Sequence, residues 1–77
     1  MARYYFDLDD EDGVTRDDTG IELPDREVVP IEVARILSDV SRDELPKKPN
    51  GSMTVYVRDE NGFVIYTGSL RSESGWL

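Results

Sequence analysis

The chain has 77 residues and a formal net charge of −8, and it contains neither cysteine nor histidine. Disulfide bonds are therefore excluded, and we expect no metal or cofactor, since protein zinc is held mainly by cysteine and histidine. A strongly acidic chain repels nucleic-acid phosphates, so we expect no nucleic-acid partner. No stretch approaches the roughly 18 apolar residues of a membrane span, and no signal peptide is recognisable. We therefore expect a cytoplasmic protein without membrane contact.

The small size of the chain limits how it can be stabilised. Small domains bury a smaller fraction of their surface than large ones, so their stability margin is thin. Without disulfides or a structural metal, good packing and association with another subunit are the remaining means of support. We expect one domain over residues 1–71, a flexible C-terminal tail over residues 72–77, and a tendency to form a homodimer.

Two short strands are predicted before the middle of the chain. Large apolar residues occupy every second position from Tyr4 to Leu8, which predicts a strand over residues 3–8. The acidic run Asp9–Gly13 ends this strand, because Asp and Gly tolerate the conformations that turns require. A short edge strand is predicted over residues 14–17. Residues 21–23 either extend this hairpin or lead into the next element.

One amphipathic helix is predicted in the middle of the chain. Asp25 suits a helix N-cap, and the apolar side chains that follow share one helical face: Val29, Val33, Ile36, Leu37 and Val40. Pro30 conflicts with a helix that runs unbroken from Asp25, because its ring nitrogen has no hydrogen to donate. We predict a separate turn at residues 25–28, a regular helix that begins near Val29 and ends by Glu44, and stabilisation of the domain by Pro30→Ala.

A second hairpin is predicted after the helix. Residues 53–58 alternate apolar and polar side chains, Asp59–Gly62 forms a tight turn with Gly62 left-handed, and residues 63–70 return. This turn would pair Asp59 with Phe63 and Val57 with Ile65. It would also direct three side chains toward the helix: Val55, Val57 and Ile65. A slip of one residue would bring Val64 and Tyr66 inward instead.

The predicted fold class is α+β, with element order ββαββ. The two hairpins form an antiparallel sheet of about four strands, and the central helix packs on one face of that sheet. The opposite face is expected to carry Tyr5, Tyr56 and Tyr66, and tyrosine is enriched at protein interfaces. Val28, Ile31 and Trp76 have no obvious place in the core. They either mark a dimer contact or cover the edges of the domain itself.

Three stretches of the sequence carry a resemblance to a known family. They are MARYYFD at residues 1–7, TGIELPD at residues 19–25 and VYVRDENG at residues 55–62. The chain resembles a family of short, acidic proteins common in rhizobia and other alphaproteobacteria and known only as a domain of unknown function. The resemblance implies a stand-alone bacterial protein, but no reaction, ligand or site residue. The chain departs from the family pattern at Pro30.

The acidic turn Asp9–Gly13 invites a calcium interpretation. The EF-hand pattern requires an oxygen ligand five residues before its glycine, and that position is Leu8 when counted from Gly13. The flanking helices of an EF-hand are also missing. A weak cation site of another kind and a plain solvated turn are the alternatives.

Catalytic machinery is not recognisable in the sequence. The hydroxyls of Ser38, Ser41 and Ser69 have no histidine to activate them. The carboxylates fall in predicted turns or on a charged helix face, where large pKa shifts are not expected. The segment Asn50–Ser52 is too short to be a phosphate-binding loop. We expect no catalytic residue and no enzymatic activity.

The preferred functional hypothesis is a small non-enzymatic module that binds a protein, a second copy included, through an open sheet face or edge strand. One alternative is a weak binder of a cation or small molecule at the acidic first hairpin. Another is an acidic mimic of nucleic acid that occupies a basic groove of another protein.

Overall fold

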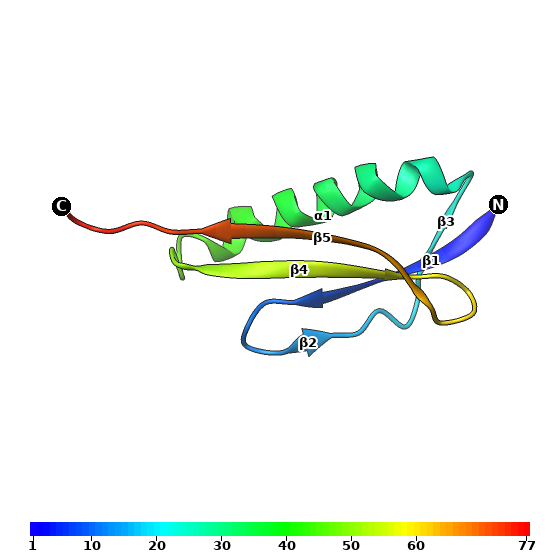
Figure 1. Ribbon diagram of the computed structural model, residues 1–77, viewed down its shortest axis with the longest axis horizontal. Coiled ribbons are helices and arrows are strands. Elements are labelled where there is room, and N and C mark those ends of the chain that lie inside the picture. The colour runs from blue at the N-terminus through cyan, green and yellow to red at the C-terminus, as the bar shows by residue number, and fades with distance from the viewer.

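The computed structural model describes residues 1–77 and has the predicted α+β architecture (Figure 1). The elements follow in the order β1 (Ala2–Asp9), β2 (Val14–Thr15), β3 (Ile21–Leu23), a 3-10 turn (Arg26–Val28), α1 (Val29–Glu44), β4 (Gly51–Arg58) and β5 (Val64–Ser72). The sheet has five strands rather than about four. The difference arises because residues 21–23 form a strand of their own.

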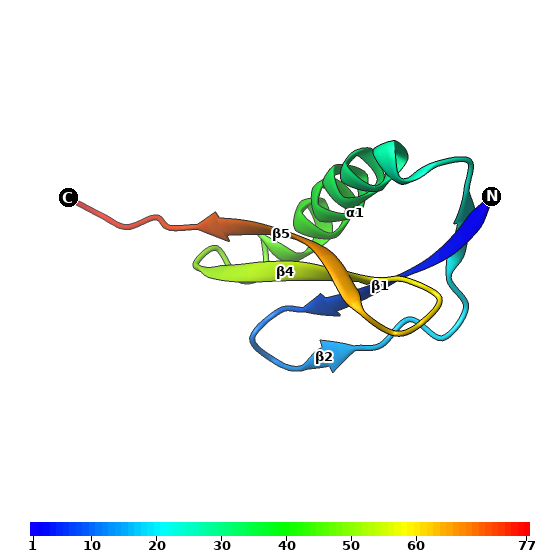
Figure 2. The same ribbon diagram turned by 45° about the vertical axis from the view of Figure 1, so that its right-hand side comes forward.

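All strand pairs in the sheet are antiparallel, and β1 and β4 occupy its centre. The main order is β2-β1-β4-β5, and β3 also pairs with β1. Figures 1 and 2 show α1 along one face of the sheet, beside β4 and β5, with the C-terminal tail extending away from the body. The molecule measures 49 × 22 × 17 Å. Neither helical segment has the length and apolarity that a membrane crossing requires.

The hydrophobic core lies between α1 and the sheet. Its buried members come from four elements, β1, β3, α1 and β4: Tyr4, Phe6, Leu23, Val29, Val33, Val55 and Val57. Val55 and Val57 are fully buried, as the alternation along the strand predicts. Of the residues without a predicted core position, Val28 packs against this core, whereas Ile31 and Trp76 are exposed.

A bulge in the second hairpin changes its predicted register. The N–H of Asp59 donates to the carbonyl of Phe63 over 2.9 Å, which confirms the predicted turn. The predicted Val57–Ile65 pair is wrong, because Val57 lies opposite Tyr66 and the register shifts between Val57 and Arg58. Ile65 is the extra residue on β5 and still packs against the core.

The bulge also moves Tyr66 to the helix side of the sheet. Cross-strand partners point to the same face, and Val57, the partner of Tyr66, points into the core. The expectation that Tyr66 lies on the open sheet face is therefore wrong. The one-residue offset, introduced by the bulge, is the physical reason.

The start of the helix agrees with the prediction. The Asp25 carboxylate accepts a hydrogen bond from the N–H of Glu27 over 2.9 Å and caps the 3-10 turn. The N–H of Val29 donates to the carbonyl of Arg26, so that carbonyl does not need an N–H from Pro30. Pro30 thus lies in the first turn of α1, where a missing N–H costs no helical hydrogen bond.

This position reverses the expected effect of Pro30→Ala. Proline in a compatible backbone conformation stabilises by restricting the unfolded chain, so its removal is expected to lower the free energy of unfolding by about 0.4–1 kcal/mol. Urea denaturation of both proteins measures the difference. A more stable Pro30→Ala variant would mean that the ring strains the helix start.

Gly68 on β5 lets α1 approach the sheet closely. A Cβ atom built on Gly68 would lie 2.5 Å from Cγ1 of Val33, closer than two carbon atoms can pack. Gly68 is paired with Val55, so it faces α1 at the centre of the core. The absence of a side chain at this position therefore sets the distance between α1 and β5.

We expect Gly68→Ala to lower the free energy of unfolding by about 1–3 kcal/mol, as overpacking of a core does. Chemical denaturation measures the loss. Gly75→Ala is the matched control, since a Cβ atom there meets nothing within 4 Å. Equal stability of the two variants would show that α1 can move away from β5 without cost.

Candidate functional site

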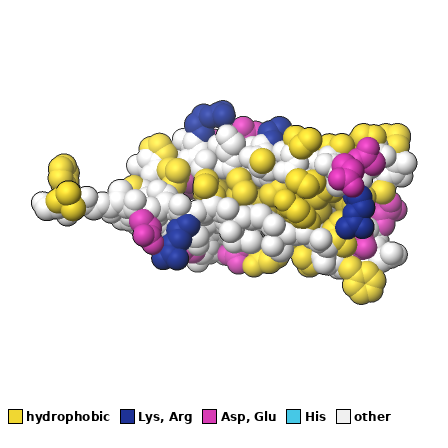
Figure 3. Space-filling model, turned by 45° about the horizontal axis from the view of Figure 1, so that its top comes forward, with side chains coloured by type: hydrophobic (Ala, Val, Ile, Leu, Met, Phe, Trp, Pro, Cys, Tyr) yellow, Lys and Arg dark blue, Asp and Glu magenta, His cyan; other side chains and the backbone are white.

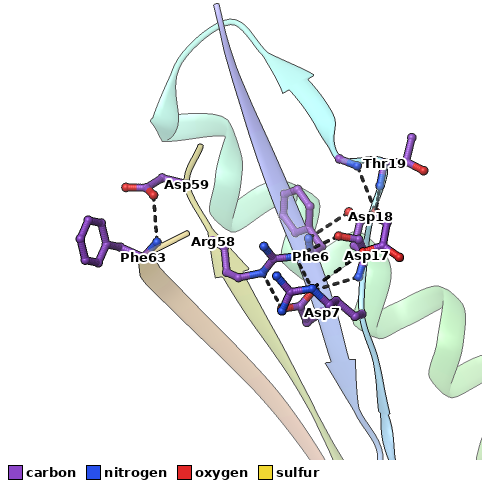
Figure 4. A network of polar contacts seen from close by, with 10 residues as sticks. Phe6, Asp7, Asp17, Asp18, Thr19, Arg58, Asp59 and Phe63 are labelled. Atoms are coloured by element: carbon purple, nitrogen blue, oxygen red, sulfur yellow. Dashed lines mark hydrogen bonds and ion pairs between the residues drawn. The ribbon is translucent and has the colours of Figure 1, made fainter. Parts of the chain in front are cut away.

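A buried ion pair lies on the sheet face opposite α1 (Figure 4). Asp7 on β1 and Arg58 on β4 form two hydrogen bonds, from Nε to Oδ2 over 2.8 Å and from Nη2 to Oδ1 over 3.1 Å. The exposed fractions of these side chains are only 12% for Arg58 and 11% for Asp7. The guanidinium carbon of Arg58 also lies 5.0 Å from the centre of the Tyr5 ring, within the range of a cation–π interaction. The pair therefore joins the two central strands across their outer face.

Asp17 connects this ion pair to the edge of β1. Its N–H donates to Asp7 over 2.9 Å, and its carbonyl accepts from Nη2 of Arg58 over 2.9 Å. Its carboxylate accepts hydrogen bonds from the N–H groups of Phe6, Thr19 and Gly20, each over 3.0 Å. Because β2 ends before Asp17 and β3 begins after it, this side chain fills the gap between the two strands. The outer edge of β1 is thereby closed along its length.

The network holds both carboxylates in their charged form. Hydrogen bonding from Arg58 lowers the pKa of Asp7 more than burial raises it, and the N–H of Asp17 adds to the lowering. Burial acts to raise the pKa of Asp17, but the N–H groups of Gly20, Phe6 and Thr19 outweigh it. Both pKa values lie below the ordinary 3.8. These carboxylates are anchors rather than proton donors at neutral pH.

The direction of these shifts predicts acid sensitivity. A carboxylate with a lowered folded-state pKa stabilises the protein above the ordinary pKa of 3.8, and this contribution is lost as the pH falls through the folded-state pKa. The free energy of unfolding should therefore decline below roughly pH 5. Asp7→Asn should lower it by roughly 1.5–3 kcal/mol at neutral pH and make it less dependent on pH. Denaturation from pH 3 to about 7 measures both curves.

Asp43→Asn is the control for this experiment, because Asp43 is exposed on α1 and belongs to no ion pair. It should retain the pH dependence of the wild-type chain. Parallel curves for wild type and Asp7→Asn would show that the network does not determine acid stability.

The acidic turn Asp9–Gly13 is tied to the rest of the chain. Oε1 of Glu11 accepts hydrogen bonds from the N–H of Ser52 over 3.1 Å and from its hydroxyl over 2.8 Å. Asp12 forms an ion pair with Lys48 over 3.1 Å. No group of three or more acidic side chains in the structure is arranged to hold a metal ion. The turn therefore works as a connection between β1 and the start of β4.

The tyrosines predicted for the open sheet face are divided between two faces. Tyr5 and Tyr56 lie beside Arg58 and Asp7, their cross-strand partners, on the face opposite α1. Tyr56 is 37% exposed. Tyr66 lies on the other face. The face opposite α1 is consequently a polar surface with two aromatic rings rather than a continuous aromatic platform.

The backbone of β5 forms the unpaired edge of the sheet. Backbone hydrogen-bonding groups alternate between the two sides of an antiparallel strand, and the N–H of Phe6 points away from β4 toward Asp17. Phe6 is paired with Val57 on β4, so the backbone groups of Val57, and by alternation those of Val55, point away from β1 and toward β5. Gly68, the partner of Val55, therefore directs its backbone groups toward β4. The outward backbone groups of β5 are then those of Thr67, Ser69 and Arg71. No strand of the chain pairs with them.

The end of the chain that contains β5 is both apolar and nearly uncharged. Residues 61–77 contain only two charged side chains, Arg71 and Glu73, which pair with each other over 2.8 Å. Six of the ten large hydrophobic residues that are exposed lie in this segment: Phe63, Val64, Tyr66, Leu70, Trp76 and Leu77. Figure 3 shows hydrophobic side chains along the middle of this side of the molecule and at the end of the tail.

Two charged residues at strand positions are the sequence signal for the network. Asp7 interrupts a strand of large apolar and aromatic residues, and Arg58 ends another strand. Strand alternation puts Asp7 on the same face as Tyr5, and Arg58 on the same face as Tyr56. Their pairing, however, depends on the register of β1 against β4, which places Asp7 opposite Tyr56 and next to Arg58. Nothing in the local pattern marks Asp17 as the link between them.

These features define a small α+β domain with one helix on an antiparallel sheet that is closed at one edge and open at the other. The chain belongs to the family described as domain of unknown function DUF6894, whose model matches residues 3–71. The predicted resemblance to a domain of unknown function is confirmed in this respect. Comparison with curated proteins and with solved structures gave no match. Membership of this family establishes no function.

Proposed function

We propose that this chain is a non-enzymatic protein-binding module that takes up an extended segment of its partner along the open edge of β5. The observation that carries the proposal is the nine-residue strand β5, whose outward backbone groups have no partner. An added strand gains main-chain hydrogen bonds along such an edge, and alternate side chains provide specificity.

The contrast between the two edges supports this proposal. Soluble proteins usually protect exposed edges with lysine, proline, bulges or covering loops. The edge at β1 is covered by β2, Asp17 and β3. β5 contains neither lysine nor proline, its single bulge lies near its start, and Arg71 is its only charge. The open edge is thus suited to pairing.

The alternatives receive less support from the contacts. Cation binding at the acidic first hairpin would compete with the hydrogen bonds from Ser52 to Glu11 and with the Lys48–Asp12 ion pair. A nucleic-acid mimic requires acidic groups at phosphate-like spacing, and seven of the ion pairs in the structure neutralise acidic groups with arginine. We further propose a bacterial cytoplasmic location, which fits a chain without cysteine.

A displayed library of random peptides, selected on the full chain at high dilution, tests the proposal. The selected peptides should be extended and free of central proline. Their binding should slow hydrogen exchange at the amides of Thr67, Ser69 and Arg71. Ser69→Pro removes one outward N–H without breaking the β4–β5 ladder, as edge strands tolerate, and it should abolish peptide binding.

Ser69→Ala is the matched control and should bind these peptides as the wild-type chain does. Thermal unfolding of Ser69→Pro verifies that the domain remains folded. Peptides that bind Ser69→Pro unchanged, or that protect amides of α1 instead, would contradict strand addition at β5.

A further inference from the structure

We infer that the partner at this edge is a second copy of the chain, whose β5 runs antiparallel to the first β5 about a two-fold axis at Leu70. The inference rests on the proposed function and specifies its partner. The resulting dimer would have one continuous sheet through both copies. The contact surface and the position of the two-fold axis follow from charge, from backbone alternation and from the placement of the exposed apolar residues.

Charge determines which surfaces of two copies can approach. Each chain has a formal net charge of −8, so two copies repel one another over most of their surface. Residues 61–77 have no net charge, because Arg71 and Glu73 neutralise each other within the chain. The β5 edge is therefore the part of the surface where a second acidic copy meets little repulsion.

Backbone alternation restricts the position of the two-fold axis. The outward groups of β5 belong to odd-numbered residues, so these residues must pair with odd-numbered residues of the partner. An axis at Leu70 satisfies this condition, because Ser69 then pairs with the partner's Arg71. It also sets Leu70 against the partner's Leu70 at a non-hydrogen-bonded position, where side chains lie closest. An axis at Arg71 would instead place two guanidinium groups opposite each other.

The same axis gives the exposed Trp76 a place to bind. Trp76 lies six residues after Leu70, and Val64 lies six residues before Leu70. An axis at Leu70 therefore brings the partner's Trp76 to the first residues of β5. β5 ends at Ser72 in the single chain. When residues 73–76 extend this strand against the partner, the alternation of side chains directs Trp76 to the face that carries Tyr66 and Leu70. A depression lies at this end of the face, between the start of α1 and β5, and it is lined by Arg26, Glu27, Val29, Pro30, Ile65 and Tyr66. Arg26, which forms no ion pair, can stack its guanidinium on the indole ring.

Two measurements over a range of protein concentrations test the inference: sedimentation velocity and tryptophan fluorescence. Trp76 is the only tryptophan and is fully exposed in the single chain, so its emission should shift to shorter wavelength as dimer forms. Both signals should have the same midpoint. Higher ionic strength should strengthen association, because salt screens the repulsion between two acidic chains.

Charged variants at the axis test the register. Leu70→Glu and Leu70→Lys place like charges opposite each other in a homodimer, and each should weaken self-association on the order of tenfold or more. An equal mixture should form a heterodimer that is tighter than either homodimer. Val14→Lys, an exposed position on β2, is the control and should leave association unchanged.

The outcomes separate this inference from the proposed function. A chain that stays monomeric up to its solubility limit overturns self-pairing, and peptide binding at β5 would then stand alone. Dimers that persist in Ser69→Pro overturn pairing through β5. A mixture of the Leu70 variants that associates no better than its components overturns the axis at Leu70. Failure of both dimerisation and peptide binding removes the proposed function as well.

Discussion

The arrangement of this protein depends on the ion pair between Asp7 and Arg58. These side chains come from the two central strands and are almost fully removed from solvent. A buried charge is tolerated only when it is paired and hydrogen-bonded, and here the N–H and carbonyl of Asp17 complete the set. The segment between β2 and β3 is thereby held against the sheet. The network thus stabilises the sheet and determines the course of a loop.

The course of that loop makes the two sheet edges different. The Asp17 carboxylate binds the N–H of Phe6 and covers the part of β1 that neither β2 nor β3 reaches. The opposite edge, β5, receives no such cover. The same asymmetry appears in the charges, since residues 61–77 carry no net charge in a chain of −8. The uncovered edge therefore coincides with the part of the chain that carries no net charge, and this is the edge for which binding is proposed.

Several elements could be predicted because their signals are local. The alternation of side chains along β1 and β4 is such a signal, and it agrees with the burial of Tyr4 and Phe6 on one strand and of Val55 and Val57 on the other. The restricted geometry of Pro30 located the start of α1. Its end at Glu44 follows from Pro46, because the residue before a proline, here Leu45, is disfavoured in a helix. The register of β5 was not predictable, because the bulge at Ile65 belongs to the pairing of β4 with β5 and nothing in the local sequence pattern marks it. That bulge alone moved Tyr66 from one face to the other.

The amino-acid sequence by itself determined the fold class, the helix limits, the apolar faces and the absence of thiol and imidazole groups. These follow from periodicity, from the backbone restrictions of proline and glycine, and from composition. Only the tertiary structure decided which charges pair, which face Tyr66 occupies and which sheet edge is covered. These features depend on contacts between residues distant in the chain, such as Asp7 with Arg58 and Gly68 with Val33. These contacts form only in one register between the strands, because a shift of one residue moves every side chain of a strand to the other face.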